Sequence, residues 1–202
     1  MKINRKRDNE EMKKTIQDDV FGKITYNDGK WVGKEPVKFT VCGKPHDIKL
    51  EVESVSEIYD EINLGIMDKT IADIIMKNSN VCNEEEALKK KEQQKALYNS
   101  IMANLSEVEK NIEEAAVQEL EEVIQDYNEE TFGKKVGKDK AVGLFAASSR
   151  EEKLESLKLK VMRVFLDRIE IKCTCDWYKY GGGFIVLENG ECIMRQLDSL
   201  SF

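Results

Sequence analysis

The sequence predicts an α+β domain in which two groups of antiparallel strands flank a long helical segment. Apolar and polar residues alternate along residues 20–53 and again along 169–194, which is typical of half-buried strands. Between these regions, residues 84–127 carry apolar side chains at spacings of three and four, which is typical of an amphipathic helix. We therefore expect an N-terminal antiparallel β-meander, a central helical segment and C-terminal antiparallel strands that complete the sheet.

The beginning of the chain differs in composition from the rest. Residues 1–19 are polar and highly charged and contain few side chains that could be buried, so we expect a flexible charged tail. The remaining residues, 20–202, are predicted to form a single domain.

Turn residues divide the first group of strands. Asp28-Gly29 predicts a tight hairpin between a strand over residues 21–26 and a return strand that begins at Trp31. Cys42–Pro45 predicts the next turn, and His46 is expected to lie in that turn on the surface.

The helical part begins with a short helix that Asp68 could cap. Residues 84–127 then form either one long helix or two, and a capping box of Ser106 and Glu109 could divide them. Glu119 lies by angle near the apolar stripe, and we interpret it as an edge residue whose carboxylate reaches water.

A basic, glycine-containing loop is expected at residues 128–149. Ser149 with Glu152 predicts a short helix after it, and Asn189-Gly190 predicts a hairpin near the C-terminus.

Composition argues against several classes of function. The chain has 202 residues and a net charge of −7, and this acidic excess disfavours binding to nucleic acid or to anionic membranes. There is no apolar run long enough for a membrane span, and no apolar stretch follows the charged N-terminus. Five cysteines at irregular spacing suit free thiols in a reducing compartment. We therefore expect a cytoplasmic protein.

The residues that usually perform catalysis or bind metals are few. His46 is the single histidine. Cys173 and Cys175 share one face of a predicted strand and are interpreted as small apolar residues that face the core. The glycines at 181–183 lack the context of a phosphate loop and suit a corner between strands. We predict no catalytic residue, no cofactor and no metal site.

One regional feature is electrostatic. Residues 84–130 hold 14 acidic and 5 basic side chains. Glu107, Glu114 and Glu121 stand seven apart and lie opposite the apolar stripe, so they form an acidic ridge along the predicted helix. This ridge is either a solvated helix face or a docking surface for a basic protein partner.

Both β regions carry motifs that resemble a known group of proteins. The N-terminal motif is Phe21-Gly22-x-Ile24-x-Tyr26 followed by Trp31-x-Gly33, and the C-terminal one is Asp176-Trp177, then the 181–183 glycines, then Asn189-Gly190. Together they resemble uncharacterised bacterial domains of unknown function, related to families associated with polymorphic-toxin immunity proteins. The resemblance covers about 35 residues at each end, and it implies a bacterial protein that binds and neutralises a toxin.

Three hypotheses for function follow. The first is a non-catalytic protein-binding domain, an immunity protein that blocks a basic toxin by occlusion. The second is an enzyme of unknown class with a pocket between sheet and helices, lined by Asp176, Tyr178 and Tyr180. The third is a scaffold that self-associates through its long helix, although a monomer is favoured because packing of the stripe on its own sheet explains the pattern equally well.

Overall fold

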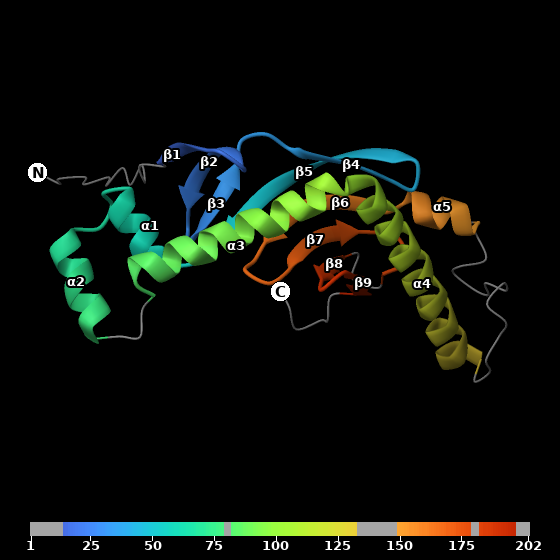
Figure 1. Cartoon of the computed structure of the whole chain (residues 1–202). Coiled ribbons are helices and arrows are strands. Elements are labelled where there is room, and N and C mark those ends of the chain that lie inside the picture. The colour runs from blue at the N-terminus through green and yellow to red at the C-terminus, as the bar shows by residue number, and fades with distance from the viewer. Residues whose placement is uncertain (1–13, 79–81, 133–148, 179–181, 197–202) are drawn as a thin grey trace, which may run out of the picture.

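A computed structural model describes residues 14–78, 82–132, 149–178 and 182–196. Its architecture is the predicted α+β arrangement: strands from both ends of the chain form one mixed sheet, and the central helices cover one of its faces (Figure 1). The strands run along the sheet in the order β1-β2-β3-β5-β6-β7-β8-β9, and β4, which lies off this path, pairs with β5.

The N-terminal strands are β1 (Thr15–Asp18), β2 (Gly22–Asn27), β3 (Lys30–Gly33), β4 (Val37–Val41) and β5 (Lys44–Glu53). The predicted hairpin between β2 and β3 is confirmed, because Asp28 and Gly29 have the positive φ angles of a two-residue turn. The expected tail is wrong over residues 15–18, which pair with β2 through their backbone. A four-residue edge strand can be held by these backbone bonds alone. Its sequence therefore does not need the alternation of apolar and polar residues from which strands were predicted.

The N-terminal strands do not form a simple meander. The ten residues of β5 pair with β4 through their first half and with β3 and β6 through their second half, so β4 does not lie between β3 and β5. His46 belongs to β5 opposite Phe39 and is half-buried, which corrects its predicted place in a surface turn. The turn itself is formed by Cys42 and Gly43, both with positive φ.

The C-terminal strands are β6 (Lys158–Val164), β7 (Ile169–Thr174), β8 (Gly183–Glu188) and β9 (Glu191–Gln196). They pair antiparallel with one another, and the predicted Asn189-Gly190 hairpin is confirmed. They join the first group through β6, which runs parallel to β5. Parallel neighbours require a crossover connection, and the intervening helices provide it.

The helices are α1 (Glu57–Asn63), α2 (Lys69–Asn78), α3 (Glu84–Ala103), α4 (Leu105–Phe132) and α5 (Arg150–Glu155). Asp68 accepts bonds from the first backbone N–H groups of α2, and Ser149 with Glu152 forms the predicted capping box of α5. The stretch 84–127 is two helices, but the break is at Asn104 rather than at Ser106. The expected loop at 128–149 begins later, because α4 continues to Phe132; residues 133–148 lie outside the described part.

The apolar core lies between the sheet and the helices. Ile112, Ala116 and Leu120 of α4 are fully buried against the inner face of the sheet, and α3 and α4 lie on the same side of it (Figure 1). The apolar stripe is thus covered within the chain. None of the helices in the described ranges combines the length and apolar character that a membrane crossing requires.

Candidate functional site

The predicted acidic ridge lies on α4, but its three members differ in environment. Glu107 is exposed, and Glu114 is exposed and faces Lys110 of its own helix at 3.4 Å. Glu121 is largely covered and forms an ion pair with Arg150 of α5 at 2.5 Å. Glu122 and Asp126, which the ridge did not include, are also exposed on this helix. We call Glu107, Glu114, Glu122 and Asp126 the acidic strip.

Other carboxylates of α4 serve the fold. Glu109 and Glu113 accept hydrogen bonds at 2.5 Å from the backbone N–H groups of Thr40 and Cys42 in and after β4. Because β4 pairs with β5 alone among the described strands, these N–H groups would otherwise lack a strand partner. Glu109 and Glu113 thus bind the edge of β4, whereas the carboxylates of the acidic strip face solvent.

Glu119 has a partner that the sequence did not indicate. Its carboxylate accepts a hydrogen bond from the Tyr178 hydroxyl at 3.0 Å, so its interpretation as a water-facing edge residue is wrong. Burial raises the pKa of Glu119, although the Tyr178 hydrogen bond acts in the opposite direction. Gly183 makes this approach possible, because a Cβ there would meet the Tyr178 ring and would lie 2.6 Å from the Arg195 carbonyl oxygen.

The two described residues of the enzyme hypothesis differ in their surroundings. Asp176 is exposed, and its backbone N–H bonds the Ser156 hydroxyl at 3.0 Å. Tyr178 is buried against Glu119, and Tyr180 lies outside the described residues.

Cys173 and Cys175 are buried in the core, as predicted. Burial raises the pKa of the Cys173 thiol to about 12 and also raises the pKa of Cys175, so both remain protonated at neutral pH. Cys42 and Cys192 are half-buried. His46 Nδ1 accepts a long hydrogen bond of 3.4 Å from the backbone N–H of Leu159, which ties β5 to β6. Within residues 14–78, 82–132, 149–178 and 182–196, no group of three or more His, Cys, Asp or Glu is placed to hold a metal ion.

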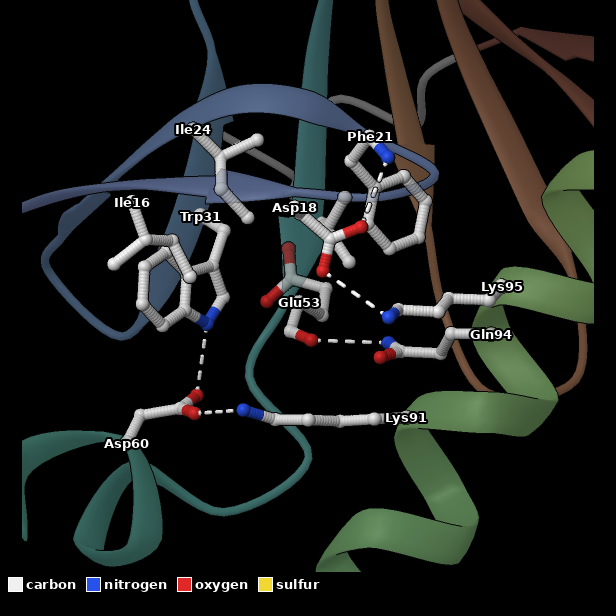
Figure 2. A pocket seen from close by; sticks show the side chains of 11 residues that line it. Ile16, Asp18, Phe21, Ile24, Trp31, Glu53, Asp60, Lys91, Gln94 and Lys95 are labelled. Carbon is white, nitrogen blue, oxygen red and sulfur yellow. Dashed lines mark hydrogen bonds and ion pairs between the residues drawn. The ribbon is translucent and has the colours of Figure 1, made fainter. Parts of the chain in front are cut away.

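A buried carboxylate that the sequence did not single out forms a polar cluster between β3, α1 and α3. Asp60 is fully buried and accepts hydrogen bonds from the Trp31 indole N–H at 2.9 Å and from the Ser54 hydroxyl at 2.6 Å. The ammonium group of Lys91 on α3 completes the set (Figure 2). It also lies 4.9 Å from the centroid of the Tyr59 ring, within cation–π range. We call Asp60, Trp31, Ser54 and Lys91 the Asp60 cluster.

The neighbouring side chains of α3 extend this cluster. Gln94 is buried and donates to the backbone carbonyl oxygens of Glu53 at 2.9 Å and Val164 at 3.3 Å. Lys95 pairs with Asp18 at 3.3 Å and Asp19 at 2.5 Å, which fixes β1 to the helix. The cavity among these side chains measures about 40 Å³, which is room for a few water molecules. Because each of these polar groups is already bonded within the chain, the arrangement joins α1, α3 and the sheet.

A second buried carboxylate lies on the opposite face of the sheet. Glu51 is 4% exposed and lies among three cations: Lys30 at 2.8 Å, Lys49 at 2.7 Å and Arg163 at 3.3 Å. Burial alone would raise the pKa of Glu51, but the hydrogen bonds from Lys30 and Lys49 outweigh it and hold this pKa at about 2. We call Glu51 with these three cations the Glu51 cluster.

Comparisons with protein-family models, with curated protein sequences and with solved structures found no match for this chain. The resemblance of its motifs to toxin-immunity domains therefore rests on the residues alone. The sequence analysis missed Glu51 and Asp60 because most of their partners are 21 or more residues away. No local pattern of residues therefore predicts these two clusters.

Proposed function

We propose that the chain is a non-catalytic protein-binding domain that neutralises a basic toxin by occlusion, with the acidic strip of α4 as its docking surface. The acidic strip supports this proposal: α4 exposes four carboxylates, with Lys110 as the cation among them. Such a field speeds association with a positively charged protein.

Helix stability does not explain this arrangement. Glu122 and Asp126 are like charges four residues apart, which destabilises a helix by a few tenths of a kcal/mol. The last turn of α4 contains Glu129 and no basic residue, although the dipole of a helix favours cations at its C-terminal end. A charge pattern that costs helix stability fits a role toward a partner.

Immunity domains are encoded near their toxins, so the resemblance to them suggests that the toxin is to be sought among the proteins encoded beside this gene. The proteins encoded beside this gene would be produced one at a time in a host that lacks it, and growth arrest would be scored. We expect one of them to arrest growth, and co-production of this chain to restore growth. Purified samples of the two proteins should form a complex whose association slows as salt rises.

The double variant E107Q/E114Q tests whether the strip is responsible. It should slow association and flatten its salt dependence, while the matched variant E188Q/E191Q, which removes two exposed charges from the β8–β9 hairpin, should behave as the unmodified chain. Rescue without a complex, or equal kinetics in the two variants, would contradict the proposal.

A further inference from the structure

The face of the sheet opposite to α3 and α4 carries a row of side chains across five neighbouring strands. Cross-strand pairs lead from Lys49 of β5 to Val161, from Val161 to Lys172, from Lys172 to Phe184 and from Phe184 to Arg195 of β9. Basic and apolar side chains therefore alternate from strand to strand. Lys49 and Arg195 are exposed and the other three are half-buried. We call these five residues the sheet row.

The cations of the sheet row differ in what they contact. Lys49 is held by Glu51 at 2.7 Å. The side chains of Lys172 and Arg195, by contrast, make no ion pair or hydrogen bond with any residue in the described ranges. Two cations flank the Phe184 ring, and no acidic side chain of the described residues pairs with them, so a carboxylate of a partner could approach both without displacing one of these.

The surface next to Arg195 is hollowed, with a volume of about 320 Å³. Val186 and Ile193, which face each other across β8 and β9, line it, and Ile193 is 39% exposed. Arg168, held by Glu170 at 2.7 Å, lies on the β7 side of the hollow. Glu188 and Glu191 line this hollow at its turn end.

We propose that the sheet row is a docking surface for an acidic amphipathic helix of another protein. Neighbouring strands are about 4.8 Å apart, so Lys172 and Arg195, two strands apart, are separated by about 10 Å. Residues seven apart on a helix are also about 10 Å apart, and a residue three or four positions on lies between them on the same side. Carboxylates at positions i and i+7 would thus meet the two cations, while an apolar residue at i+3 or i+4 would contact Phe184.

The alternative occupants fit this surface less well. Surfaces that bind single-stranded nucleic acid present several aromatic rings, whereas the sheet row has one, and the chain carries a net charge of −7. The α4 ridge of a second copy has the seven-residue spacing, but Lys110 stands between Glu107 and Glu114, and Glu121 is bound to Arg150. Exposed Glu188 and Glu191 at the β8–β9 turn keep an acidic helix away from that end of the strands.

The test uses two peptides of the same composition. In the first, Glu recurs every seven residues with Leu three or four positions after each, in a background of Ala and Gln; in the second, the order is scrambled. Fluorescence anisotropy would measure the binding of each peptide to the full chain. We expect the ordered peptide to bind more tightly, and K172E/R195E to weaken its binding at least about tenfold, because two attractions become repulsions.

The matched variant K69E/K89E reverses two exposed lysines on α2 and α3 and should bind as the unmodified chain does. The milder K172Q/R195Q reports the same loss if the reversal disturbs folding. Four results would overturn the proposal: no binding of the ordered peptide, equal binding of the scrambled peptide, tighter binding of an oligouridylate that depends on the same two cations, or self-association that K172E/R195E abolishes.

Discussion

Two buried carboxylates on opposite faces of one sheet have different surroundings. Asp60 is bound by an indole N–H, a hydroxyl and a single ammonium group, and the helices α1 and α3 enclose it. Glu51 is bound by three cations whose side chains are 26% (Lys30), 49% (Lys49) and 32% (Arg163) exposed. The Lys91 side chain is 28% exposed, so the two clusters differ mainly in the number of cations: one beside Asp60 and three beside Glu51.

This difference indicates a structural role for the Asp60 cluster and a role in binding for the face that carries the Glu51 cluster. In the Asp60 cluster one carboxylate balances one ammonium group, and the main effect of such a pair is to hold elements together. In the Glu51 cluster one carboxylate holds three cations, so positive charge remains in excess there, and the sheet row continues from it through Lys49. We therefore expect substitutions at Asp60 to change stability, and substitutions on the face that carries the Glu51 cluster to change binding as well.

The largest effect is expected from D60N. The amide cannot balance the charge of Lys91, and breaking a buried ion pair on one side costs about 3 kcal/mol or more of unfolding free energy. Chemical denaturation would measure this loss. The control D73N removes an exposed carboxylate from α2 and should stay within about 0.5 kcal/mol of the unmodified chain. A D60N variant as stable as the control would show that the Asp60 cluster does not hold the fold.

The next effect is expected from E51Q, and it depends on pH. The folded-state pKa of Glu51, at about 2, lies below the ordinary value of 4.5, so its contribution is present above about pH 4.5 and is lost as pH falls toward 2. E51Q should therefore lower the unfolding free energy by about 2 kcal/mol near neutral pH, with the difference shrinking in acid.

Denaturation curves of E51Q at several pH values, with E53Q of the same strand as control, would measure this dependence. A difference that stays constant down to about pH 2.5 would mean that the cations do not hold Glu51 ionised.

A smaller difference in unfolding free energy is expected between substitutions at Glu109 and Glu113, which bind the edge of β4, and substitutions at the exposed Glu107 and Glu114. E109Q/E113Q weakens the charge-assisted hydrogen bonds to the backbone after Phe39 and Val41, and should cost about 1–2 kcal/mol of unfolding free energy. E107Q/E114Q removes exposed charges and should cost less than about 0.5 kcal/mol. Thermal melts of both variants would measure the difference; equal losses would show that α4 does not hold the edge of β4 through these carboxylates.

The smallest effect is expected at Glu119, whose donor is a neutral phenol instead of a cation. Because its folded-state pKa is raised, the protonated form is favoured, and its contribution is lost as pH rises through that pKa. E119Q does not titrate, so its stability relative to the unmodified chain should improve between about pH 4 and pH 7 by no more than about 1 kcal/mol. A relative stability that falls over this range in thermal melts would reverse the assigned direction of the shift.

Local signals predicted the elements that depend on neighbouring residues. Asp28-Gly29 and Asn189-Gly190 placed two hairpins, and Ser149 with Glu152 placed the start of α5, because turns and caps are formed within a few residues. The parallel junction of β5 and β6 was not predicted, because it joins segments 112 residues apart (Lys49 and Val161) with no sequence mark of their pairing.

The residues of the candidate sites were also predicted correctly where their environment depends on the local sequence, and were missed where it depends on distant segments. The period of α4 correctly placed Glu107 and Glu114 on an exposed face, but it could not show that Glu121 pairs with Arg150, 29 residues later. In the sequence, Glu51 and Asp60 cannot be distinguished from ordinary polar residues of a strand and a helix, because their burial depends on side chains from distant segments.

The proposed docking on the sheet row requires that the face of the sheet opposite to α3 and α4 binds a protein while the Asp60 cluster does not take part. Titrating the ordered acidic peptide into isotopically labelled protein, observed by NMR, tests it most directly, because the Trp31 indole N–H reports on the Asp60 cluster. We predict that the amide signals of Lys172, Phe184 and Arg195 shift and saturate while the Trp31 indole signal stays in place. A shift of the Trp31 signal with no change along the sheet row would contradict the claim.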